Sequence, residues 1–116
     1  MPGRARSAFD TGVLHIEIRD EAAATRCLLS GEVDISNVDE VRAAMGLLHV
    51  AGHRRVLVDL SDLWFLGVVG MRTLMETHAA FRAEEREFAV VGASPSIRRM
   101  LVLAGVAQPL GISASE

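Results

Sequence analysis

The side chains best suited to chemistry are two histidines and a few carboxylates. His49 and His53 are four residues apart, which is the spacing of two metal ligands on one face of a helix. Gly52 lies between them, however, and glycine commonly ends a helix. No cysteine or acidic cluster nearby supplies a third ligand. The pattern favours two histidines at a helix end over a metal site, and we expect neither a metal nor a cofactor.

Asp59 follows a run of apolar residues that predicts a buried strand. Receiver domains of two-component systems carry a phosphorylated aspartate at such a position, together with acidic residues that hold magnesium and a lysine that binds the phosphoryl group. Asp20 and Glu21 could imitate the acidic pair, but the chain contains no lysine. The sequence therefore favours a strand-end aspartate that hydrogen-bonds a neighbouring loop.

The segment FLGVVGMRTL, residues 65–74, lies where this strand meets a helical pattern. A helix start usually carries a hydroxyl or a carboxylate as its cap, and loss of such a cap costs about 1 kcal/mol. Gly67, Val68, Val69 and Gly70 offer neither group. The nucleophile pattern G-x-S-x-G and the glycine-rich phosphate loops are also missing. With no nucleophile and base pair in view, we expect a protein that is not an enzyme.

Composition narrows the class of protein further. A chain of 116 residues, half of them apolar, is enough for one domain with its own core. The net charge of −3 argues against nucleic-acid binding, and no apolar run reaches the roughly 18 residues of a membrane span. The single cysteine, Cys27, suggests a reducing, cytoplasmic location. We expect one domain over residues 1–116 with its core over about 12–110, and loose ends in MPGRARSAFD and PLGISASE.

Apolar periodicity predicts the first half of the fold. Alternation predicts strands over 12–20 and 24–35, paired antiparallel because the link between them is short. A helix is predicted over 36–52, with Ser36 as its cap, Asp39 completing a capping box and Gly52 at its end. Its apolar stripe consists of Val38, Val41, Met45 and Leu48.

The second half alternates strands and helices. Residues 54–61 are continuously apolar and β-branched, which predicts a strand covered on both faces. Apolar residues at helical spacing from Met71 to Phe81 predict a helix, residues 88–92 a short buried strand, and residues 94–105 a helix capped by Ser94. A last strand over 107–112 is left open. Helices between strands predict right-handed crossovers and a parallel or mixed sheet.

Three ordered blocks together resemble the STAS domain, in particular the bacterial anti-sigma factor antagonists. They are LLSGEVDISNVDEVRAAM, RRVLVDLSDLWFLGVVGMRTL and FAVVGASPSIRRMLVLAGV, and the resemblance runs from about Leu14 to Ala107. It implies an α/β fold in which a mixed β-sheet has flanking helices in the order β-β-α-β-α-β-α. This order agrees with the elements predicted from the pattern.

The resemblance also implies a site at the helix start. In that family a strand ending in Asp-Leu is followed by phenylalanine, one residue, and then Asp-Ser-(Ser or Thr)-Gly, whose first serine is phosphorylated. Phe65 and Gly70 keep this pattern, whereas Gly67 replaces the aspartate, Val68 the phosphoacceptor serine and Val69 the second hydroxyl. We therefore expect no phosphorylation at this position.

The partner implied by the resemblance is an anti-sigma factor with a kinase-like ATPase fold, which would make the chain a regulator of transcription. The expected partner-binding residues are Asp34, Ser36, Asn37, Gly67, Val68, Val69, Gly70 and Met71. Helix capping is an alternative role for Asp34 and Ser36. Exposed valines beside Trp64 would add to an apolar patch, although part of that run is expected to be core.

Three alternatives remain open at this level. Lone STAS-like domains also serve as structural subunits of lipid-transport or stress-sensing complexes, where the serine can be dispensable. The junction could instead have drifted after loss of function. A homodimer built on residues 64–71 is compatible with an apolar patch there.

Overall fold

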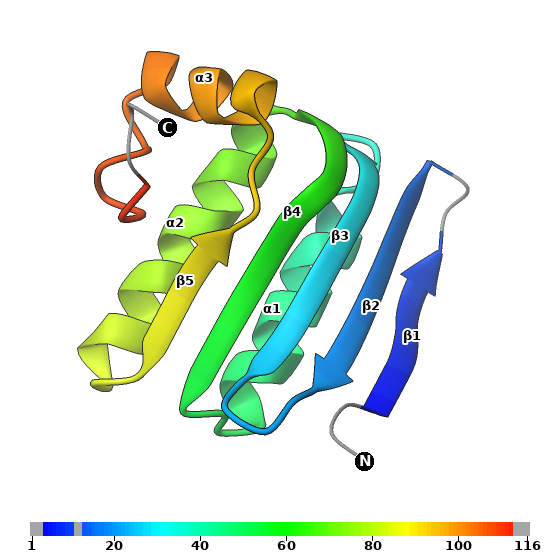
Figure 1. Ribbon diagram of the computed structural model, residues 1–116, viewed down its shortest axis with the longest axis vertical. Helices are drawn as coiled ribbons and strands as arrows, with labels where there is room; N and C mark the ends of the chain where they lie inside the picture. Colours follow the sequence, from blue (N-terminus) through cyan, green and yellow to red (C-terminus); the bar gives the residue numbers. More distant parts are fainter. Residues whose placement is uncertain (1–3, 11–12, 113–116) are drawn as a thin grey trace.

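A five-stranded mixed sheet forms the centre of the computed structural model, which describes residues 4–10 and 13–112, the first range as backbone only (Figure 1). The strands lie in sequence order across the sheet. In chain order the elements are β1 (Arg4–Asp10), β2 (Leu14–Asp20), β3 (Thr25–Val33), α1 (Val38–Val50), β4 (Arg55–Leu66), α2 (Val68–Ala83), β5 (Glu87–Val91) and α3 (Pro95–Leu103).

The lengths of the connections explain why the sheet is mixed. The short link between β2 and β3 leaves these strands antiparallel, with Ile18 opposite Cys27. α1 and α2 each return the chain to the same end of the sheet, so β3, β4 and β5 run parallel. The predicted order β-β-α-β-α-β-α is confirmed for β2 through α3. One strand, β1, precedes it and pairs antiparallel with β2.

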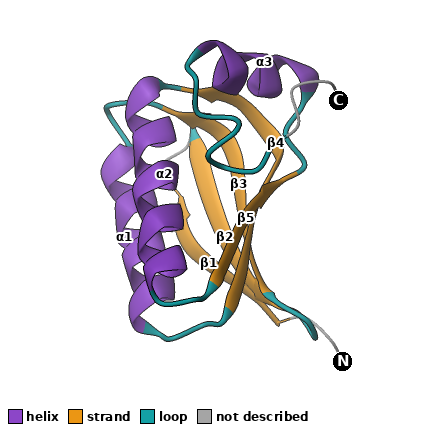
Figure 2. Ribbon diagram, turned by 90° about the vertical axis from the view of Figure 1, so that its left-hand side faces the viewer, coloured by secondary structure: helices purple, strands orange, loops and turns teal. Residues whose placement is uncertain are grey.

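Both long helices cover the same face of the sheet (Figure 2). Two successive right-handed crossovers in one direction place their helices on one side, which explains this arrangement. In β4, Val56, Val58 and Leu60 are therefore buried, while Leu57 and Asp59 on the other face stay partly exposed. The prediction that this strand is covered on both faces is wrong.

The core lies between this face and the two helices. The predicted stripe of α1, from Val38 to Leu48, is buried, and so are Leu74 and Phe81 of α2. Against them pack the inward residues of β2, β3, β4 and β5.

Other differences from the sequence prediction lie at element boundaries. The opening segment, expected to be a loose end, supplies β1. β4 continues to Leu66, so Ser61 lies within the strand and not on a turn after it. Residues 107–112 form turns, with the Ile112 N–H donating to the Ala107 carbonyl, and not a strand. Residues 113–116 of the closing segment lie outside the described residues.

Helix ends follow the predicted residues in two cases and differ in one. Ser94 caps α3 by accepting a hydrogen bond from the Ile97 N–H at 3.2 Å. Gly52 follows α1 with φ +79°, a conformation that glycine adopts without strain. The prediction of Ser36 as the cap of α1 is wrong, because the N-cap residue is Asn37 and the Ser36 hydroxyl donates instead to Asp34.

Candidate partner-binding site

The start of α2 is held against the end of β3 by backbone contacts. Gly67 is the N-cap residue, and its N–H donates to the Val33 carbonyl at 2.8 Å. The Gly67 carbonyl in turn accepts from the N–H groups of Gly70 and Met71. No side chain caps the helix, and its first turn has no acidic residue. The helix therefore begins without the polar group that its first turn normally recruits.

The two valines at this start differ in exposure. Val68 is 66% exposed, whereas Val69 is partly buried against the core. Met71 is only 5% exposed, and Gly70 is buried. Gly70 and Met71 therefore fix the helix on the sheet, and Val68 is the residue of this segment that faces solvent. Met71 does not contribute to an exposed patch.

Gly70 marks the closest approach of α2 to the sheet. A Cβ built on Gly70 would lie 2.7 Å from Leu66 Cδ1 and 2.8 Å from Val33 Cγ1. Both distances are shorter than van der Waals contact, so a larger side chain cannot enter without moving its neighbours. Close packing against Leu66 and Val33 therefore explains why a glycine occupies position 70, where the pattern implied by the resemblance also has glycine.

The second segment of the site is the turn between β3 and α1. Asp34 Oδ1 accepts hydrogen bonds from the Ser36 N–H at 2.9 Å and the Ser36 hydroxyl at 2.5 Å. Asn37 is buried, and its side chain accepts from the Asp34 N–H and donates to the Glu32 carbonyl. Asn37 thus holds the turn from inside, while Asp34 and Ser36 remain accessible.

Hydrogen bonds keep the Asp34 carboxylate charged. The Ser36 hydroxyl, followed by the Ser36 N–H, lowers the pKa of Asp34 below its usual range. The two segments also touch each other, since a Cβ on Gly67 would lie 3.7 Å from the Asp34 Cα. The structure therefore brings the predicted residues of 34–37 and 67–71 together at one end of the sheet.

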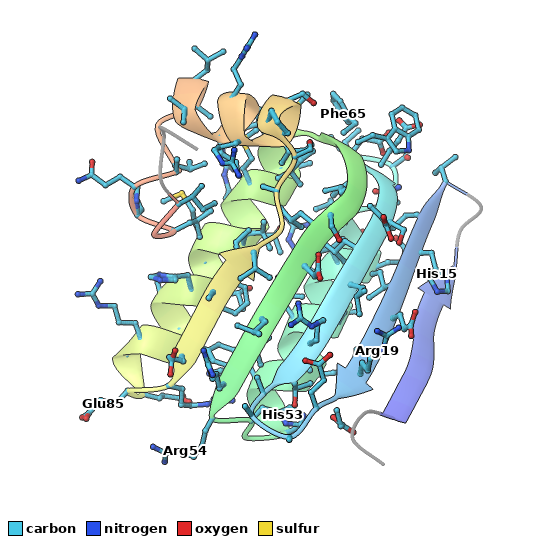
Figure 3. All side chains as sticks on the ribbon, in the orientation of Figure 1. His15, Arg19, His53, Arg54, Phe65 and Glu85 are labelled. Carbon is cyan, nitrogen blue, oxygen red and sulfur yellow. The ribbon has the colours of Figure 1, made fainter. Side chains whose placement is uncertain are left out.

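Sequence reasoning named the apolar residues beside the valines at the end of the strand but missed Ile35. Ile35 is 81% exposed and Trp64 is 64% exposed, and Phe65 is 38% exposed at the end of β4 (Figure 3). Part of this run was expected to be core because aromatic residues at a strand end usually are, but the buried residue is Leu66 and not an aromatic one. Ile35 was detectable only as an apolar residue directly after the charged end of a strand.

Asp59 lies away from this end and makes structural contacts. Its carboxylate accepts from the Ser61 hydroxyl at 2.6 Å and pairs with Arg26 at 2.9 Å. Arg26 also pairs with Glu21. Asp59 thus bonds its own strand and β3, not a loop. Burial alone would raise the pKa of Asp59, but the bonds from Ser61 and Arg26 outweigh burial and lower it.

The two histidines have separate contacts. The His49 ring contacts Phe81 at a tilt of 51° and lies 3.2 Å from a Glu84 carboxylate oxygen, whereas His53 lies 3.1 Å from the Thr25 hydroxyl. Within residues 4–10 and 13–112, no group of three or more histidine, cysteine or acidic side chains is arranged to hold a metal ion. In the same part of the chain, no helix is both long and apolar enough to cross a bilayer.

Comparison with known families defines the class of protein. The family described as "Mlab, STAS domain" matches residues 16–112. This chain therefore belongs to the STAS domain family, and the resemblance found in its sequence is confirmed. No curated protein sequence matches the chain.

Several solved structures of anti-sigma factor antagonists are similar to this chain. An anti-sigma factor antagonist from Mycobacterium paratuberculosis is similar with a TM-score of 0.80 and 25% identity, over 89% of this chain and 87% of the other. The antagonist SpoIIAA in its unphosphorylated form has a TM-score of 0.65 at 16% identity, over 90% and 84% of the two chains. An antagonist STAS domain from Rhodobacter sphaeroides has a TM-score of 0.60 at 18% identity, over 72% and 90%. The last two support the fold alone.

Proposed function

We propose that this chain is a non-enzymatic STAS regulator that binds an anti-sigma factor of kinase-like fold through the turn 34–37 and the start of α2. In binding that partner, the chain would release a sigma factor and so regulate transcription. Because Val68 has no hydroxyl, binding would not be reversed by phosphorylation at that position. Control would then rest on the amount of the protein. Its cytoplasmic location stays a prediction.

The exposure of Val68 is the observation that supports this proposal most directly. The Val68 side chain is 66% exposed, and it directly follows Gly67, where the start of α2 meets Phe65 and the turn at Asp34. Exposed apolar side chains beside a rigid polar turn are typical of a surface that a partner covers. The similarity to an anti-sigma factor antagonist at 25% identity is consistent with such a partner.

Capture of partners tests the binding. The chain, immobilised through its C-terminus, is expected to retain a kinase-fold protein from a lysate of its source organism, identified by mass spectrometry. The V68D variant places a charge at the exposed start of α2 and should lose this protein. The L47D variant, at an exposed residue of α1, serves as the matched control. Equal retention by both variants would contradict a site at α2.

Incubation with the captured kinase and ATP tests the missing switch. The wild-type mass is expected to stay unchanged, whereas G67D/V68S should gain one phosphate, since it restores the acidic residue and the hydroxyl of the family pattern. Phosphate on the wild-type chain within residues 65–74 would refute the proposal.

A second candidate function is favoured by the family match itself. The matching family is described as Mlab, and not as an anti-sigma factor antagonist. A subunit of a larger assembly, such as a lipid-transport complex, needs no phosphorylated serine. Retention of transporter subunits in place of a kinase-fold protein would decide for this role.

A further inference from the structure

Many acidic residues of the described chain are paired with arginines: Glu17, Glu21, Asp39, Asp59, Glu84 and Glu87. Glu76 on α2 and Glu85 after it form no arginine pair with any described residue. At the end of the sheet near α2, Glu32 and Asp62 form no ion pair with any described residue, and Asp34 is held by Ser36 without an arginine. Glu40, in the first turn of α1, has a buried oxygen with no hydrogen-bond partner. Carboxylates without cations therefore gather at this end.

These carboxylates share a surface with the exposed aromatic residues. The register of β3 and β4 places Glu32 opposite Phe65, and Asp62 precedes Phe65 by three residues on the same strand. The Glu32 N–H donates to the carbonyl of Val13, which is also exposed. We call this surface the strand-end patch. It consists of Val13, Glu32, Asp34, Ile35, Asp62, Trp64 and Phe65.

Two features of the strand-end patch select the same ligand chemistry. Carboxylates without partners attract a cation, and the face of a tryptophan binds a guanidinium or ammonium group. Trp64 offers such a face, because it is largely exposed and lies on the strand between Asp62 and Phe65. The carboxylates and the tryptophan face thus both favour a cation, and the exposed Ile35 and Val13 provide apolar contact around it.

We propose that the strand-end patch binds a segment of a partner protein in which an arginine or lysine stands beside an apolar side chain. The cation would stack on Trp64 and pair with Glu32 or Asp62, while the apolar side chain would cover Ile35. This inference rests on the proposed function, since it describes the partner's contact surface and adds Glu32, Asp62 and Trp64 to the site.

A second copy of the chain fits this surface less well. A symmetric contact would bring the carboxylates of both copies together, and like charges repel. The exposed Arg72 belongs to α2, where it lines a groove of about 210 Å³ with Val68 and Ala104, and it pairs with none of the carboxylates of the patch.

Fluorescence of Trp64, the single tryptophan of the chain, reports directly on this patch. The chain is titrated with a synthetic peptide that carries arginines around a leucine core and, separately, with the same peptide carrying glutamates in their place. The arginine peptide is expected to change the Trp64 emission saturably, and the change should weaken as salt rises from about 0.05 M to about 0.5 M because the charges are screened. The glutamate peptide should have no effect.

Charge-neutral variants locate the binding. The variant E32Q/D62N is expected to bind the arginine peptide about three- to tenfold more weakly. The variant E76Q/E85Q removes two acidic residues that also lack arginine partners but lie on α2 and after it, and it should bind like wild type.

The inference would be overturned by an equal response to both peptides, by no saturable response to either, or by unchanged binding of E32Q/D62N. Emission that depends on protein concentration without peptide would show a second copy as the occupant and would equally refute it. Partner capture decides the proposed function separately, so a failure of one test is distinguishable from a failure of the other.

Discussion

Replacing Gly70 with alanine tests how closely α2 is seated on the sheet. The added Cβ would meet Leu66 Cδ1 at 2.7 Å and Val33 Cγ1 at 2.8 Å, and both side chains are buried. Val33 is β-branched and cannot rotate away easily. Such overpacking costs about 1–3 kcal/mol, whereas alanine regains at most about 1 kcal/mol of helix propensity. We therefore expect G70A to lose about 1–2 kcal/mol of unfolding free energy.

Urea denaturation followed by circular dichroism measures this loss, and the thermal midpoint should fall by about 4–8 °C per kcal/mol. The matched control is G46A in α1, where a Cβ would meet nothing within 4 Å. This variant should gain about 0.5–1 kcal/mol. If both variants change stability in the same direction, the packing argument for Gly70 is wrong.

Three further predictions concern the sheet. The pKa of Asp59 is lower in the folded state than in the unfolded state. The stability that Asp59 contributes is therefore complete above its unfolded pKa of about 3.9 and is lost as the pH falls through the folded pKa. Urea midpoints measured at a series of decreasing pH values should fall less for D59N than for wild type. Burial raises the pKa of Cys27 to about 12. A thiol reagent at about pH 8 should therefore label the folded chain slowly and the unfolded chain at once. Prompt labelling of the folded chain would contradict this burial. Gly31 has a φ of +97°, and a Cβ there would lie 2.0 Å from the Val13 carbonyl oxygen. The G31A variant should therefore lose about 3 kcal/mol or more of unfolding free energy. Wild-type stability of G31A in the same urea assay would refute that geometry.

The spacing of apolar residues predicted the elements in which buried residues recur at a regular helix or strand interval. The helical spacing of Val38, Val41 and Leu48 defined the buried face of α1, and alternation defined β2. The second half of β4 could not be found in this way, because its buried residues Leu60, Leu63 and Leu66 are three apart. The pairing with β3 is irregular there, with register shifts after Leu28 and Gly31, so that neither strand nor helix periodicity applies.

The position of the candidate site was predictable from the sequence, but its surface was not. The family pattern located the start of α2, and the structure brings it next to the turn at Asp34. Burial then divided the predicted residues, because Asn37 and Met71 face the core while Val68 faces solvent. Ser36 and Asn37 are both good helix caps, so only the structure shows that Asn37 is the N-cap residue and that Ser36 binds Asp34.

Two of the three departures from the phosphorylation pattern that the resemblance implies, those at Gly67 and Val68, differ in how easily they can be reversed. The Val68 side chain is mostly exposed, so a serine there meets no steric limit. A Cβ at Gly67 would lie 3.3 Å from the Val33 carbonyl oxygen and 3.6 Å from Phe65 Cε2, so an aspartate there requires the carbonyl or the ring to yield by a few tenths of an ångström. An aspartate at position 67 would therefore displace Phe65 or the Val33 carbonyl and change the surface. A serine at position 68 would leave that surface unchanged. The single variant V68S restores the hydroxyl without altering the proposed docking surface. Its phosphorylation and its partner binding can therefore be measured without the change of shape that G67D would add.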